Sequence, residues 1–124
     1  MGEVLFWLYL INAVLLICHE IDSAYWREWE MFKLPGGEGF FVLLHFPLVF
    51  VVLYGLVLVW EGATAGLVIS LLLAASGLFA FTIHTVFIAR GHHQFKTAMS
   101  LFVLLATLLA SLAQAVVTVL LLAG

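Results

Sequence analysis

The chain has 124 residues, of which 66% are hydrophobic and 9% are charged, and its formal net charge is -3. Soluble domains are about half apolar and about a quarter charged, so this composition excludes a soluble domain and a disordered tail. Four Lys and Arg residues in total are too few for a nucleic-acid-binding groove, and a single cysteine excludes an internal disulfide. The length allows one domain, residues 1–124, with about four membrane spans of roughly 20 residues each.

Four apolar stretches follow one another along the chain. They cover, in order, residues 4–18, 40–60, 63–89 and about 95–123. The first is expected to continue as a helix through Asp22. Short connections make neighbouring helices antiparallel, so the sequence predicts an all-α, integral membrane, up-down bundle of four transmembrane helices. An alternative architecture pairs two such chains as a homodimer across a helix face.

The basic residues all fall on one side of this topology. Arg27 and Lys33 follow the first span, and Arg90 and Lys96 lie between the third span and the fourth. Both connections are on the side opposite the amino terminus. Since Lys and Arg accumulate on the cytoplasmic side of membrane proteins, we expect both termini to lie outside the cytoplasm. The chain is therefore predicted to be a multi-pass protein of a cell membrane, such as the bacterial inner membrane.

The histidines gather in the half of the bundle that is predicted to be cytoplasmic. Ionisable side chains within membrane spans are costly and are functional candidates by default. With a rise of 1.5 Å per residue, three of them fall in one layer below that surface, and two open the fourth span. In chain order the five are His19, His45, His84, His92 and His93.

Two carboxylates flank the first histidine. Asp22 lies three residues after His19, so both side chains can reach one ligand. Glu20 points about 100° away from His19 around the helix. Which of the two carboxylates joins the site depends on the rotation of the helix, and the sequence leaves both open.

A polar stripe runs along the first helix. Asn12, His19 and Ser23 share one face, and Glu30 extends it if the helix continues that far. Asn12 lies at about the same depth as Gln114 of the fourth span. A hydrogen bond between these two side chains would satisfy both within the membrane.

Imidazoles and carboxylates together are the ligands that zinc and non-haem iron prefer. His19, His45 and His84 supply the three protein ligands of a catalytic zinc, with Glu20 or Asp22 as fourth ligand or general base. His92 and His93 are candidate ligands of a second metal ion. The alternative for any single histidine is a hydrogen bond to a backbone carbonyl.

Residues 19–30 read HEIDSAYWREWE, and the spans that follow carry His45 and His84. The chain resembles small bacterial four-helix membrane proteins of uncharacterised function with a histidine–acid signature, akin to the HxxEE-type group. Here Glu20 and Asp22 follow His19, in place of a literal HxxEE. The resemblance implies a metal site and assigns no reaction.

Three classes of function fit these observations. The first is a metal-dependent membrane enzyme, a hydrolase or an isomerase, whose substrate is a lipid or another apolar molecule. The second is a haem or quinone redox protein, in which His45 and His84 on facing helices are the natural haem ligands. The third is a non-enzymatic metal-binding or interaction subunit. The sequence favours the first of these.

Overall fold

The computed structural model describes residues 2–124, and within them every regular element is a helix. The elements are α1 (Gly2–Tyr25), α2 (Glu28–Met31), α3 (Gly37–Trp60), α4 (Thr64–Ala89), the 3-10 helix η1 (His93–Lys96) and α5 (Ala98–Ala123). Four of these helices, α1, α3, α4 and α5, are long and apolar enough to cross a membrane. The predicted all-α bundle with four membrane-spanning helices is confirmed.

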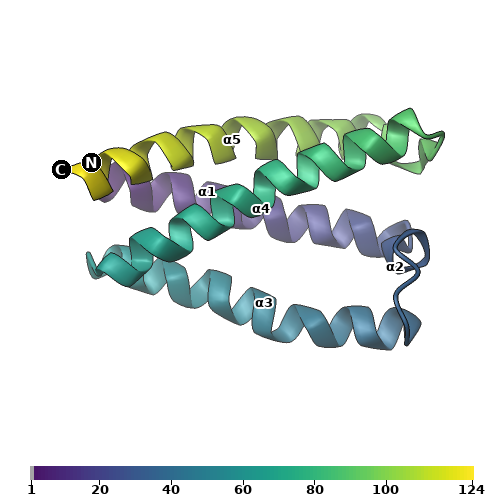
Figure 1. Ribbon diagram of the computed structural model, residues 1–124, viewed down its shortest axis with the longest axis horizontal. Helices are drawn as coiled ribbons and strands as arrows, with labels where there is room; N and C mark the ends of the chain where they lie inside the picture. Colours follow the sequence, from purple (N-terminus) through teal and green to yellow (C-terminus); the bar gives the residue numbers. More distant parts are fainter. Residues whose placement is uncertain (1) are drawn as a thin grey trace.

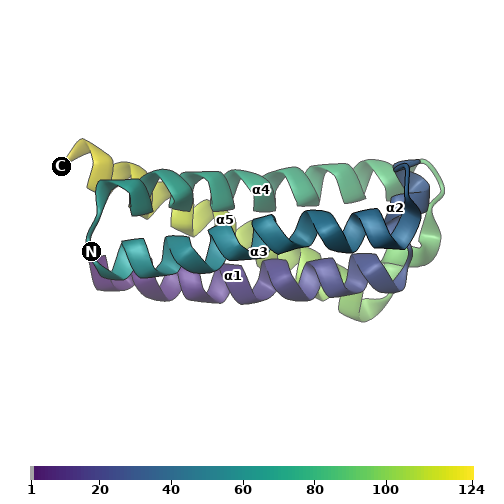
Figure 2. The ribbon, with the colours of Figure 1, turned by 90° about the horizontal axis from the view of Figure 1, so that it is seen from below.

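The four long helices run alternately up and down (Figure 1). Both termini lie at one end of the bundle, and α2 and η1 lie at the other, which we call the α2 end. Helices α1, α4 and α5 pack against one another, whereas α3 packs against only two of the other long helices, α1 and α4. From their short connection, α3 and α4 diverge towards the α2 end in Figure 1, and Figure 2 shows α2 across that end. This divergence positions the candidate site.

Small and hydroxylated residues line the contact between α4 and α5, because in lipid such residues let helices approach closely. Gly77 faces Ser111, whose side chain occupies the space that a Cβ atom at position 77 would need. The buried hydroxyls of Ser70 and Thr118 share a hydrogen bond of 2.8 Å. Small and hydroxylated side chains therefore form the close contact between these two helices.

The predicted hydrogen bond between the first and last spans is confirmed. Asn12 Nδ2 donates to Gln114 Oε1 at 2.8 Å and to Ser111 Oγ at 3.1 Å. Gln114 Nε2 in turn donates to Ser70 Oγ at 2.9 Å, which links α1, α5 and α4. All four side chains are fully buried. The network satisfies polar groups that would otherwise be costly in the apolar interior.

We expect Asn12→Leu to lower the free energy of unfolding in detergent by about 1 kcal/mol, because it leaves the Gln114 amide oxygen without its donor. Thermal unfolding measures the effect. The matched control is Ile11→Leu, at an exposed neighbouring position on the same helix. Equal stabilities of the two variants would contradict the prediction.

Two element boundaries differ from the sequence prediction. Helix α1 ends at Tyr25, because the chain turns through a left-handed conformation at Arg27 (φ 55°) before α2 begins. Glu30 therefore does not extend the buried stripe of α1, and its exposed side chain pairs with Arg27. Helix α5 starts at Ala98, so His92 and His93 lie in the turn and in η1 rather than at the start of the fourth span.

Candidate functional site

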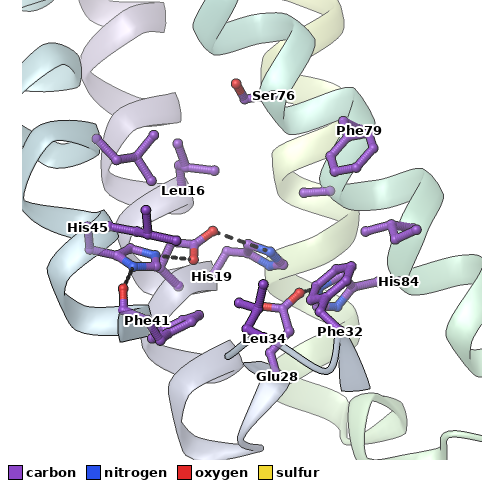
Figure 3. Close-up of a pocket in the computed structure, with 15 residues that line it drawn as sticks. Leu16, His19, Glu28, Phe32, Leu34, Phe41, His45, Ser76, Phe79 and His84 are labelled. Carbon is purple, nitrogen blue, oxygen red and sulfur yellow. Dashed lines mark hydrogen bonds and ion pairs between the residues drawn. The ribbon is translucent and has the colours of Figure 1, made fainter. Parts of the chain in front are cut away.

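A cavity of about 350 Å³ lies between α1, α3 and α4 at the α2 end. Its ionisable lining comes from four helices: His19 and Glu20 from α1, Glu28 from α2, His45 from α3 and His84 from α4. In Figure 3, His19 lies between His45 on one wall and His84 on the other. The structure therefore brings three of the five predicted histidines to one cavity.

His45 and Glu20 form the first imidazole–carboxylate pair, with 2.6 Å between His45 Nε2 and Glu20 Oε2. The other ring nitrogen, Nδ1, lies 2.6 Å from the carbonyl oxygen of Phe41. Since a carbonyl only accepts, Nδ1 carries a hydrogen, and Nε2 is left to face the carboxylate. A hydrogen bond between Nε2 and Oε2 then requires one further proton, which the two groups share. This pair is suited to giving and taking a proton.

His84 and Glu28 form the second pair, with 3.1 Å between His84 Nε2 and Glu28 Oε1. Both side chains are buried, and the ring of Phe95 packs on His84 with 4.2 Å between centroids. Burial raises the pKa of the Glu28 carboxyl, but the hydrogen bond from His84 and the charges of the neighbouring histidines outweigh it. The net result is a pKa below the ordinary value, which favours the carboxylate.

His19 connects the two pairs. Its Nε2 lies 3.9 Å from Glu20 Oε1, and its ring meets that of His84 edge-on, with 4.5 Å between centroids. The side chain is only 3% exposed, because the same face of α1 carries the buried Asn12 and Ser23. The five ionisable side chains therefore form one continuous cluster, which we call the His–Glu cluster: His19, Glu20, Glu28, His45 and His84.

The remaining predicted site residues lie elsewhere. Asp22 accepts a hydrogen bond from Ser100 Oγ, at 2.8–2.9 Å from its two oxygens, beside the first turn of α5. His92 packs against the ring of Phe87, with 5.3 Å between centroids. Neither Asp22, His92 nor His93 lines the cavity. Helix rotation thus selects Glu20 over Asp22, a choice that the sequence left open.

The sequence did not predict Glu28 as a site residue, because Glu28 follows the first span in a segment that was expected to be only a connection. The carboxylate reaches the cavity only because the chain breaks at Arg27 and restarts as α2, with Glu28 turned inward and 6% exposed. The available signal was the position of Glu28 between Trp26 and Trp29, on the side of the membrane where the histidines gather. Helical spacing from His19 pointed to Glu30 instead.

The arrangement fits a shared metal ion less directly than it fits proton transfer. Within residues 2–124, no group of three or more His, Cys, Asp or Glu side chains is placed to hold a metal ion. The Nε2 atoms of His45 and His84 are directed at different carboxylates instead of at one point. A zinc or iron ion would have to displace these hydrogen bonds, so the predicted metal site stays a prediction.

The fold and the cavity define a four-helix membrane protein with a histidine–carboxylate site at one end. The chain belongs to the family of unknown function DUF6713, which it matches over residues 5–121. No curated protein and no solved structure is detectably similar to it.

The lowered pKa of Glu28 predicts a pH dependence of stability. A carboxyl whose pKa is lower in the folded than in the unfolded chain stabilises the fold above its ordinary pKa of 4.5. That contribution is lost as the pH falls through the lower folded value. We expect the difference in unfolding free energy between wild type and Glu28→Gln to shrink as the pH falls below about 4.5.

The control for this measurement is Glu30→Gln on the same short helix, where the side chain is exposed. Its effect on stability is expected to stay within about 0.5 kcal/mol. Unfolding in detergent between about pH 6 and about pH 3 measures both variants. A wild-type advantage over Glu28→Gln that grows as the pH falls below about 4.5 would contradict the prediction.

Proposed function

We propose that the protein is a membrane enzyme that uses the His–Glu cluster for acid–base chemistry on a lipid or another apolar substrate. One observation carries the proposal: two imidazole–carboxylate pairs face one cavity between membrane-spanning helices. A proton donor and a proton acceptor in reach of the same bound molecule are what general acid–base catalysis needs. The histidine–acid signature of the sequence is, in this proposal, the His19 and Glu20 part of the cluster.

The side walls of the cavity support an apolar substrate. Leu44 and Leu48 of α3 and Phe79 of α4 line the cavity and are also exposed on the outer surface of the bundle. In a membrane this surface faces lipid. The cavity thus has a lateral opening between α3 and α4, through which a molecule dissolved in the bilayer can present its polar end to the cluster.

Isomerisation of a double bond is the reaction that the two pairs fit best. The His45–Glu20 pair gives its shared proton to one carbon, while the second pair takes a proton from a carbon next to the double bond. The double bond shifts by one position, and the composition of the substrate does not change. The enzyme is restored when the second pair loses a proton and the first pair regains one.

Deuterium exchange tests this proposal without knowledge of the substrate. The protein, in bilayer discs, is incubated in D₂O with a total lipid extract, and lipid masses are compared with those from a His45→Phe control. We expect one lipid class to gain deuterium at carbon, or to be consumed, with wild type only. No lipid labelled or consumed above the control would contradict the proposal.

A metal-dependent hydrolase is the second candidate, and the donor chemistry of three imidazoles and two carboxylates favours it. In that case His19, His45 and His84 would hold zinc or iron, and the ion would activate water. Metal analysis of the purified protein tests it. His45→Leu and His84→Leu would each abolish stoichiometric binding, whereas Asn12→Leu would not.

We propose the orientation with both termini outside the cytoplasm, since all four Lys and Arg residues lie in the connections at the α2 end. The His–Glu cluster then opens on the cytoplasmic half of the membrane. We expect tags at either terminus of the protein to react with an impermeant reagent on intact cells. Protection of either tag until the cells are lysed would contradict this orientation.

A further inference from the structure

The charge of the cavity lining restricts the polar end of the molecule that binds there. The lining includes two carboxyl groups, those of Glu20 and Glu28, and every lining residue lies in the described part of the chain. None of these residues is a lysine or an arginine. The cluster therefore offers no permanent positive charge.

The basic residues near the α2 end are directed elsewhere. Arg27 pairs with Glu30 at 3.4 Å, and its side chain is 68% exposed. Lys33, Arg90 and Lys96 are exposed as well. Proteins bind phosphate and carboxylate mainly through Arg, Lys and backbone amides. The imidazoles of His45 and His84 are already engaged with the carboxyls of Glu20 and Glu28. An anionic headgroup inside this cavity would therefore meet two carboxyls in a medium of low dielectric constant, where like charges repel strongly.

The cavity nevertheless offers partners for a different polar group. The carboxylate oxygens of Glu20 and Glu28 accept hydrogen bonds, and His19 has no hydrogen bond of standard length to either one. A hydroxyl or an amine can donate to these oxygens, and the surrounding leucine and phenylalanine side chains suit an adjoining hydrocarbon. A volume of about 350 Å³ accommodates a polar end and the first part of a chain, with the remainder between α3 and α4.

Building on the proposed function, we infer that the substrate is an apolar molecule whose polar end is a non-anionic hydrogen-bond donor, a hydroxyl or an amine. Phosphate-headed lipids and free fatty acids are excluded from the cavity. The bulk phospholipid of the membrane would then surround the protein without occupying its site.

Three photoreactive probes test this inference. They share one alkyl chain with a diazirine and differ only in their head, which is a hydroxyl, an ammonium or a phosphate. After irradiation in bilayer discs, mass spectrometry compares labelling of the buried cavity residues Leu16, Phe41 and Ala80 with labelling of Leu109, an exposed residue of α5 away from the cavity. The labelling of the cavity residues divided by the labelling of Leu109, which we call the cavity ratio, corrects for different partitioning of the probes into the bilayer.

We expect the cavity ratio of the hydroxyl and ammonium probes to exceed that of the phosphate probe at least about tenfold. A phosphate probe that labels the cavity as well as the others would overturn the inference and leave the proposed function standing. If no probe labels the cavity while all of them label Leu109, the proposed function fails as well.

Two variants on α2 test the electrostatic cause. Glu28→Gln removes one carboxyl from the cavity and is expected to raise the cavity ratio of the phosphate probe at least about threefold. Glu30→Gln removes an exposed carboxyl from the same helix and is expected to leave the ratio unchanged. Thermal unfolding in detergent reports whether each variant retains the bundle. An equal response of the two variants would contradict the role of the cavity charge.

Discussion

Glu20→Gln is expected, under the proposed function, to reduce the rate of substrate conversion by about 10²–10⁴-fold, the usual contribution of a positioned acid or base. The glutamine amide is nearly isosteric with the carboxyl but cannot exchange a proton with His45 Nε2, which lies 2.6 Å from Glu20 Oε2. Initial rates of deuterium incorporation into the responding lipid measure the loss. The fold should survive, because Glu20 is not part of the fully buried polar network of α1, α4 and α5.

Asp22→Asn is the matched control, a carboxyl-to-amide change two residues further along the same helix. Asp22 accepts from Ser100 at the start of α5 and does not line the cavity. We therefore expect a lower thermal stability and a rate within about threefold of wild type. Equal losses of activity in the two variants would show that the change acts through the fold and not through the cavity.

The layout of the bundle could be predicted from the sequence because the bilayer restricts the choices. Four apolar stretches with short connections have one simple arrangement, and buried polar groups must find partners within it. The pairing of Asn12 with Gln114 follows from their similar depth alone. The same argument of depth predicted that His19, His45 and His84 share a layer, and the structure places all three around one cavity.

The details of the cluster depend on features that periodicity does not encode. Helix rotation decides that Glu20 faces His45 while Asp22 faces Ser100. The inward position of Glu28 depends on a left-handed residue at Arg27, a conformation that no residue except glycine favours and that only the surrounding packing can impose. Side chains next to an element boundary are therefore the least predictable part of this site.

The angle between α3 and α4, which opens the cavity, depends on how closely the two helices approach at the opposite end. There Gly66 of α4 packs directly on the backbone of α3. A Cβ atom at this position would lie 2.6 Å from the backbone nitrogen of Val59 and 2.7 Å from the carbonyl carbon of Leu58. Both are main-chain atoms of a continuous helix, so no side-chain rotation relieves the clash.

Gly66→Ala is accordingly expected to lower the free energy of unfolding by about 2–3 kcal/mol, because the two helices must separate. Gly39→Ala in α3 is the control, since a Cβ atom there meets nothing within 4 Å. In a helix this second change should raise stability by about 0.5–1 kcal/mol. Thermal unfolding in detergent compares the two. If Gly66→Ala proved as stable as Gly39→Ala, close contact at this end would not be what sets the divergence of α3 and α4, and the geometry of the cavity would need another cause.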